Sequence, residues 1–161
     1  MAIQIGDSLP DGTFIEMGED GPAEVTTSQF TTGKTVIFGL PGAYTGTCTT
    51  AHVPSFIRTK DALAAKGVTD ILCISVNDPF VMQAWGESTG ASAAGIRMLA
   101  DADASFTKAL GMEFTAPPVG LFDRSKRYSM VVDGGKVTQL NEEPSPGECE
   151  IAAGETLLAQ L

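Results

Sequence analysis

Near-continuous apolar runs dominate the hydrophobic pattern of this chain. Residues 34–39 and 70–76 form two such runs, and their length and β-branched content predict buried strands. The second run is apolar at almost every position, as in a central strand that is covered on both faces. Two further runs, 128–132 and 136–140, flank a turn-forming Asp-Gly-Gly sequence and predict a β-hairpin.

Helical segments follow the two buried strands. Residues 49–66 predict a helix that ends at Gly67, because glycine favours the left-handed conformation found at helix C-termini. Pro54 lies inside this segment and predicts a kink, since proline cannot donate to the preceding turn. After the second strand, Asp78 predicts an N-cap for a helix that runs from Pro79 to about residue 89.

Shorter elements complete the pattern. We expect a hairpin of residues 13–17 and 23–27, a strand at 97–100, a short helix at 103–110 and a terminal helix at 155–161. Strands that alternate with helices predict an α/β fold with a mixed central sheet flanked by helices. The length suits a single domain that spans residues 1–161.

Composition and charge limit the partners and the location. The chain has 20 acidic and 10 basic residues, a net charge of −10, and an acidic surface repels nucleic-acid phosphates. No apolar run approaches the roughly 20 residues that a membrane-spanning helix needs. The first residues lack the basic and apolar segments of a secretory signal. We therefore expect a cytoplasmic protein with reduced cysteines and no nucleic-acid or membrane partner.

Cys48 is the strongest candidate for a reactive residue in this sequence. It stands where a loop after the 34–39 strand enters the first turn of the 49–66 helix. Unpaired backbone N–H groups and the positive end of the helix dipole face such a position, and both favour the reactive thiolate. The alternative is that Cys48 is a small buried hydrophobic residue, which is the usual fate of a free cysteine.

The cysteines do not form a metal-binding pattern. Cys48, Cys73 and Cys149 are far apart in the chain and include no C-x-x-C pair. His52, the single histidine, lies one helical turn after Cys48, but zinc would need further ligands that no nearby segment supplies. We expect neither a metal nor another cofactor.

Three ordered segments resemble the peroxiredoxins. Residues 41–48 contain the Pro-x-x-x-Thr-x-x-Cys pattern of the peroxidatic loop, and residues 52–54 follow it as in the type II branch of that family. Residues 74–82 are similar to a strand-to-helix junction of this branch, and residues 124–132 are similar to its arginine-bearing strand. The resemblance implies a thioredoxin-like fold with an N-terminal extension, and a thiol peroxidase that acts on hydrogen peroxide and organic hydroperoxides.

The resemblance also implies roles for four residues. Cys48 would supply the attacking thiolate, and Arg127 would stabilise that thiolate and the charge that develops on the leaving oxygen. Thr45 would place its hydroxyl beside the sulfur, and Pro41 would stiffen the loop. From the residues alone, Thr45 could instead cap the helix, and Arg127 could belong to a solvated basic cluster.

Peroxide attack leaves a sulfenic acid on Cys48, which a thiol must reduce. Cys149 is the favoured resolving residue because it lies in a Pro- and Gly-rich segment, and loops can move. Cys73 lies in the 70–76 run, where a buried core thiol is the simpler interpretation, although plant type II relatives carry a functional cysteine at a similar place. The third route is direct reduction by glutaredoxin, glutathione or thioredoxin.

Gly46 departs from the family pattern, in which proline usually precedes the Thr-Cys pair. Glycine predicts a more flexible loop. We expect activity to survive, because the spacing between Thr45 and Cys48 is intact.

Two other functions remain open from the sequence. Cys48 and His52 could form the dyad of a cysteine-dependent hydrolase, although no third, orienting group is apparent and the family does not use this histidine as its main activator. A non-enzymatic redox sensor would be oxidised at Cys48 without turnover. The resemblance further implies a homodimer.

Overall fold

The computed structural model of the protein describes residues 2–161, so Met1 of the expected domain lies outside the described residues. The strands are β1 (Thr13–Gly18), β2 (Gly21–Thr26), β3 (Lys34–Gly39), β4 (Val68–Ser75), β5 (Arg97–Ala100), β6 (Glu113–Ala116), β7 (Leu121–Ser125), β8 (Tyr128–Asp133) and β9 (Lys136–Glu142). The helices are η1 (Thr27–Phe30), η2 (Cys48–His52), α1 (Val53–Ala65), α2 (Pro79–Thr89), α3 (Ser105–Ala109), η3 (Pro117–Val119) and α4 (Gly154–Ala159).

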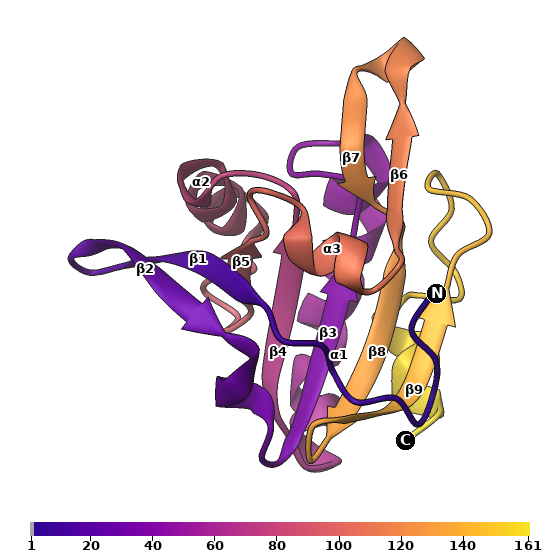
Figure 1. Cartoon of the computed structure of the whole chain (residues 1–161). Helices are drawn as coiled ribbons and strands as arrows, with labels where there is room; N and C mark the ends of the chain where they lie inside the picture. Colours follow the sequence, from indigo (N-terminus) through magenta and orange to yellow (C-terminus); the bar gives the residue numbers. More distant parts are fainter. Residues whose placement is uncertain (1) are drawn as a thin grey trace.

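A seven-stranded sheet forms the centre of the molecule, in the order β2-β1-β5-β4-β3-β8-β9 (Figure 1). β3 pairs in parallel with β4, and β4 in parallel with β5, whereas the other neighbours in the sheet are antiparallel. The mixed sheet predicted from the alternation of strands and helices is therefore confirmed.

Alternate residues of the central strands point to opposite faces of the sheet, and each face is covered. On one face, Phe38 and Cys73 pack in a cluster with Trp85 of α2 and with apolar residues of α1. On the other face, Ile37 packs with Phe106 of α3. In Figure 1, α3 lies in front of the sheet and α1 behind it. The double coverage explains why β3 and β4 are apolar at successive positions.

Several predicted elements are confirmed in detail. The strands at 34–39 and 97–100 have the predicted bounds. Asp78 caps α2, since its carboxylate accepts from the backbone N–H of Val81 at 2.8 Å. These elements carry strong local signals, which are a bounded apolar run or a capping residue followed by proline.

Pro54, where we predicted a kink, lies directly after a change of helix type. The segment begins as the π-helical turn η2, in which the N–H of Val53 donates to the carbonyl of Cys48, and it then continues as α1. Pro54 therefore falls in the first turn of α1, where an α-helix does not use the backbone N–H group. α1 begins at Val53, so Pro54 is the second residue of the regular helix that follows the π-helical turn.

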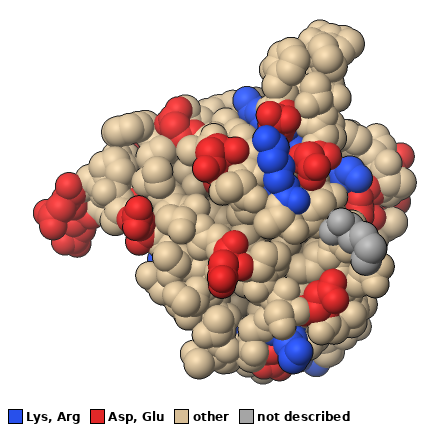
Figure 2. Space-filling view, in the orientation of Figure 1, with Lys and Arg blue, Asp and Glu red and all other residues tan. Residues whose placement is uncertain are grey.

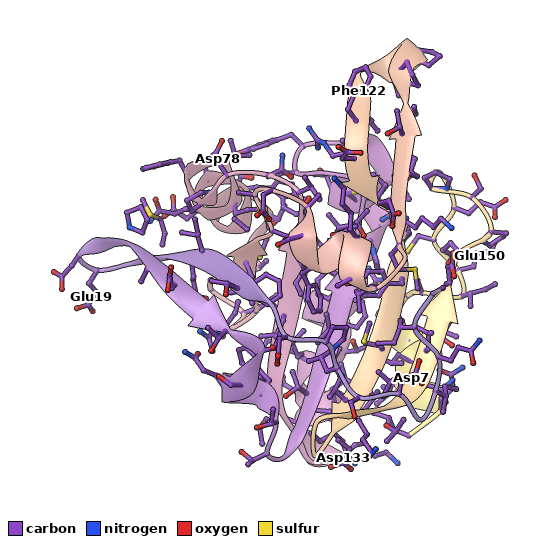
Figure 3. All side chains as sticks on the ribbon, in the orientation of Figure 1. Asp7, Glu19, Asp78, Phe122, Asp133 and Glu150 are labelled. Carbon is purple, nitrogen blue, oxygen red and sulfur yellow. The ribbon has the colours of Figure 1, made fainter. Side chains whose placement is uncertain are left out.

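The antiparallel pair β6 and β7, which the sequence analysis did not predict, projects from the body as an arm (Figure 1). Its strands are short, and two prolines in η3 interrupt the apolar pattern between them. Val119 and Phe122 are 71% and 60% exposed. Figure 3 places Phe122 on the arm, and Figure 2 shows a tip that bears no charged side chains in that view. We call residues 113–125 the β6–β7 arm.

Among residues 2–161, no helix has the length and hydrophobicity to cross a membrane.

Candidate active site

Cys48 lies at the start of η2, directly after the loop that leaves β3. Gly46 and Thr47 form the first helical residues, so the sulfur belongs to the first turn of a helical segment that continues through α1. The side chain of Cys48 is buried, with 1% of its surface exposed. The predicted position at the entry to a helix is confirmed, and the thiol is also shielded from bulk water.

Arg127 lies between β7 and β8 and brings its guanidinium group to Cys48. Its Nη2 atom donates to the Cys48 sulfur at 3.2 Å and to the carbonyl of Pro146 at 2.9 Å. Its Nη1 atom bonds Nδ1 of His52 at 3.0 Å. Arg127 is 1% exposed, so the basic cluster at 124–127 is not simply a solvated face.

The buried charge of Arg127 has an electrostatic consequence for the sulfur. None of the ion pairs found among residues 2–161 includes Arg127. A buried cation is costly unless an opposite charge compensates it. The sulfur of Cys48 accepts a hydrogen bond from this guanidinium, so the positive charge acts directly on that sulfur.

His52 is a part of the site that the sequence analysis left out. Because the guanidinium of Arg127 can only donate, Nδ1 of His52 accepts, and Nε2 carries the proton that it donates to the carbonyl of Ala152 at 3.0 Å. Burial lowers the pKa of His52 to about 3, the charge of Arg127 acts in the same direction, and the bond to Ala152 opposes both. His52 is therefore neutral at pH 7, and both of its ring nitrogens bond groups other than Cys48.

Thr45 and Pro41 lie in the loop that precedes Cys48. The hydroxyl of Thr45 donates to the carbonyl of Gly42 at 2.7 Å, which closes the loop on itself. The carbonyl of Pro41 accepts from Nη1 of Arg124 at 3.1 Å. A Cβ atom on Gly42 would lie 2.5 Å from that same Nη1, so a larger residue there would require the end of the Arg124 side chain to move.

A second contact holds the other side of the same loop. The side-chain oxygen of Asn77 accepts from the N–H of Ala43 at 3.0 Å and from the hydroxyl of Ser75 at 2.6 Å. The end of β4 therefore fixes the loop that carries Thr45. The segment at 74–82 thus meets the segment at 41–48 in space, although the spacing in the sequence gave no sign of this contact.

Two cavities meet at Arg127. One, of about 300 Å³, opens beside residues 45–47, which directly precede Cys48, and is lined mainly by apolar groups: Pro41, Thr45, Gly46, Thr47, Phe114, Ala116, Val119, Leu121, Arg127, Pro146 and Gly147. The other, of about 420 Å³, lies behind Pro146 and is lined by Phe114, Lys126, Arg127, Glu142, Glu143, Pro144, Pro146 and Ile151. The first cavity has a size suited to a small molecule and brings Thr45 and Arg127 to one wall.

Cys73 and Cys149 occupy different environments. Cys73 is fully buried in β4, and this burial raises the pKa of its thiol well above the usual range. Cys149 is half-buried, and burial raises the pKa of its thiol to about 11, a shift that Arg127 partly opposes. In this conformation both groups are protonated thiols at pH 7.

The segment that carries Cys149 is anchored to the site. We call residues 143–152 the C-terminal loop; Figure 3 shows Glu150 on it, beside β9. Besides the bonds from Arg127 to Pro146 and from His52 to Ala152, the hydroxyl of Thr47 donates to the carbonyl of Gly147 at 3.0 Å. The loop therefore forms one wall of the site and is not a free surface segment.

In the part of the chain that the structure describes, no group of three or more histidine, cysteine, aspartate or glutamate side chains is placed to hold a metal ion.

Comparison with known proteins agrees with this arrangement. Residues 4–158 match the Redoxin family. Peroxiredoxin-2C from Oryza sativa subsp. japonica is 44% identical over 161 residues, covering 99% of this chain and 98% of the relative. The structure of reduced Prx3 from Vibrio vulnificus in complex with hydrogen peroxide is similar with a TM-score of 0.89 and 46% identity, over 98% of each chain. Peroxiredoxin 5 from Alvinella pompejana gives a TM-score of 0.81 at 31% identity, over 98% of this chain and 96% of that one.

The chain therefore belongs to the redoxin family, and its thioredoxin-like fold is confirmed. Within that family it is a type II peroxiredoxin, a thiol-dependent peroxidase with an antioxidant function.

Proposed function

We propose that Cys48 is the thiol that attacks the peroxide, that Arg127 stabilises both the thiolate and the leaving oxygen, and that Thr45 and Pro41 shape the pocket. The observation that carries this proposal is the buried guanidinium of Arg127, 3.2 Å from the Cys48 sulfur and outside every ion pair found in residues 2–161. An arginine in this setting offers a planar set of donors to the sulfur and to an incoming peroxide together.

The chemical step follows from this geometry. The Cys48 thiolate attacks one oxygen of the hydroperoxide, an S–O bond forms, and the O–O bond breaks. The second oxygen leaves with the electron pair and takes a proton, so the products are a sulfenic acid on Cys48 and water or an alcohol. Negative charge moves from sulfur to the leaving oxygen, and fixed donors that face both atoms lower the barrier for that transfer.

The cavity beside Cys48 supports small organic hydroperoxides as substrates along with hydrogen peroxide. Its walls are largely apolar, with Phe114, Val119 and Leu121 of the β6–β7 arm on one side. Burying an alkyl group there contributes about 0.8 kcal/mol for each CH₂ removed from water.

For recycling, we propose reduction of the sulfenic acid by an external thiol, from glutathione, glutaredoxin or thioredoxin, with Cys149 as the resolving residue only after the C-terminal loop moves. Its half-burial and raised pKa make Cys149 a weak nucleophile in the present conformation. Cys73 is the less suitable candidate because it is buried in a central strand.

We also propose that residues 1–161 act as one domain that forms a homodimer in the cytoplasm. Four exposed apolar side chains support the dimer, and each is more than half exposed. Val119 and Phe122 lie on the β6–β7 arm, Tyr44 lies in the loop before Cys48, and Phe80 lies in α2. Such exposed apolar groups favour a protein partner.

A hydrolase dyad of Cys48 and His52 has less support. The two ring nitrogens of His52 bond Arg127 and Ala152, and the low pKa of this histidine makes it a poor base. A redox sensor without turnover is distinguished by steady-state kinetics.

The test is peroxide consumption by the reduced protein, with dithiothreitol as the thiol. We expect multiple turnovers with the wild type and with Cys149→Ser, and none with Cys48→Ser. Oxidation of the wild type without turnover would support the sensor, and activity of Cys48→Ser would contradict the assignment of Cys48.

A further inference from the structure

We propose that Glu143 is a positioning residue of the peroxidase site, which acts on Arg127 through the C-terminal loop and His52. This inference rests on the proposed function of Cys48 and Arg127. It names a residue that contacts neither the sulfur nor the cavity beside it.

Glu143 is a charged residue in an unusual position. It is 5% exposed, and its carboxylate turns back onto its own loop. One oxygen, Oε1, accepts from the N–H groups of Glu150 at 2.6 Å and of Ala152 at 2.7 Å. A buried carboxylate with two backbone donors fixes the turn between them, because each bond would be costly to lose in the interior.

Ala152 connects this carboxylate to the site. Its N–H donates to Glu143, and its carbonyl accepts from Nε2 of His52 at 3.0 Å. The position of the Ala152 carbonyl therefore depends on the carboxylate. A histidine that is held at one nitrogen by a fixed acceptor keeps its proton there and leaves the other nitrogen free to accept.

That free nitrogen is the acceptor for Arg127. Nδ1 of His52 bonds Nη1 of the guanidinium at 3.0 Å, while Nη2 reaches the Cys48 sulfur at 3.2 Å. If His52 carried its proton on Nδ1, two donors would face each other, and the guanidinium would have to rotate away. The tautomer of His52 therefore decides whether the donor fork points at the sulfur.

Glu143 also holds Arg127 through the main chain. The N–H of Glu143 donates to the carbonyl of Arg127 at 3.0 Å. The backbone of Glu143 thus holds the main chain of Arg127. The side chain of Glu143 acts, through Ala152 and His52, on the guanidinium group of the same arginine. Glu143 touches no reacting atom, so its effect has to appear in the orientation of these two side chains.

The test uses the fact that His52 is the single histidine of the chain. Labelling with ¹⁵N-histidine gives the signals of this ring alone, and the ¹⁵N shifts report which nitrogen carries the proton. We compare the wild type with Glu143→Ala, which removes the acceptor, and with Glu143→Gln, which keeps an oxygen at the same place. For each protein we also measure the rate of iodoacetamide alkylation of Cys48 at pH 7 from its peptide mass.

Asp101 supplies a matched control. It is fully buried, and its carboxylate accepts from the N–H groups of Phe106 at 3.1 Å and Thr107 at 2.8 Å, at the start of α3. Asp101→Ala therefore removes a buried carboxylate with two backbone donors at a place outside the proposed chain of contacts. Loss of stability alone would affect both alanine variants in the same way.

We expect a proton on Nε2 of His52 in the wild type, in Glu143→Gln and in Asp101→Ala. In Glu143→Ala the ring signals should shift toward a mixture of tautomers, and alkylation of Cys48 should slow about tenfold, the size typical of losing an outer partner that orients a histidine.

Two results would overturn the inference. One is a proton on Nδ1 in the wild type, a measurement that requires no variant to fold. The other is wild-type tautomer and alkylation in a folded Glu143→Ala. Neither depends on peroxide turnover, so an inert wild type with the expected ¹⁵N shifts would contradict the proposed function while still showing that Glu143 orients His52 and Arg127.

Discussion

Cys48 and Cys73 are both buried free cysteines, 1% and 0% exposed, within one apolar cluster. They differ in what faces the sulfur. Cys73 lies in the central strand β4, paired between Phe38 of β3 and Met98 of β5, and burial raises its pKa. Cys48 lies in the first turn of a helical segment, and its sulfur accepts a hydrogen bond from Arg127.

Burial alone therefore does not distinguish the two thiols, since both are almost fully covered. Burial raises the pKa of Cys73 and the charge of Arg127 opposes this rise only in part, whereas Cys48 accepts a hydrogen bond directly from the Arg127 guanidinium. The same low polarity that raises the pKa of Cys73 strengthens the interaction between Arg127 and Cys48.

The largest effect on peroxide turnover should come from replacing each of the two cysteines separately. We expect Cys48→Ser to abolish peroxide turnover, because a hydroxyl at neutral pH is a far weaker nucleophile than a thiolate. Cys73→Ala should retain turnover and lose stability, since it leaves a small cavity in the core. Peroxide consumption and urea unfolding of both variants measure the two effects. Full activity of Cys48→Ser, or loss of activity in a folded Cys73→Ala, would contradict the claim that Cys48 reacts with peroxide and Cys73 does not.

Replacing Arg127 should make Cys48 resemble Cys73. Arg127→Gln removes the charge, and we expect kcat/KM for hydrogen peroxide to fall about 10²–10³-fold, the range for losing one preorganised donor at a developing charge. Arg127→Lys keeps the charge without the planar fork and should recover only part of that loss. Stopped-flow measurement of the peroxide reaction gives these values. Equal activity of the lysine variant and the wild type would show that charge alone suffices.

The neutral state of His52 predicts a pH-dependent stability. In the unfolded chain His52 has a pKa near 6.5, and in the folded protein burial lowers its pKa to about 3. Between these values the unfolded state binds one more proton, so the stability contribution is complete above pH 6.5 and decreases toward pH 3 by about 1.4 kcal/mol for each pH unit. Urea unfolding of the wild type and of His52→Gln at pH 7, 6 and 5 should show a steeper decrease for the wild type. Parallel curves would mean that His52 is not buried and neutral.

The smallest effect is expected at Gly46. A Cβ atom there would meet no atom within 4 Å, and Gly46 begins the helical segment, where proline is favoured. Gly46→Pro should raise the unfolding free energy by about 0.4–1 kcal/mol through the unfolded state and change kcat/KM only a few-fold. Thermal unfolding and peroxide kinetics measure both. A many-fold rise in activity would show that flexibility of this loop has a catalytic cost.

The parts of the molecule that local patterns determine were predictable from sequence. The strand at 34–39, the cap at Asp78 and the position of Cys48 in the first turn of a helical segment all depend on neighbouring residues. The approach of Arg127 to Cys48 was expected from the family resemblance alone, because 79 positions separate the two residues and only the sheet brings them together.

The contacts that orient Arg127 could not be predicted in this way. His52 was one turn from Cys48, a spacing that suggested a dyad, yet its ring faces Arg127 and Ala152. In the sequence, Glu143 is one acidic residue among many in an acidic chain. Its proposed role depends on the C-terminal loop, which folds back over about ten residues and brings the N–H groups of Glu150 and Ala152 to its carboxylate. Contacts of this kind depend on tertiary packing, which periodicity and capping rules do not describe.

The most direct test of the central claim is to trap the sulfenic acid. The reduced protein receives one equivalent of hydrogen peroxide in the presence of dimedone, and peptide mass analysis locates the adduct. We predict an adduct on Cys48 and none on Cys73, although both are buried. Peroxide consumption with Cys48 unmodified, or equal labelling of the two cysteines, would contradict the claim that Arg127 and the helix start make one buried thiol reactive.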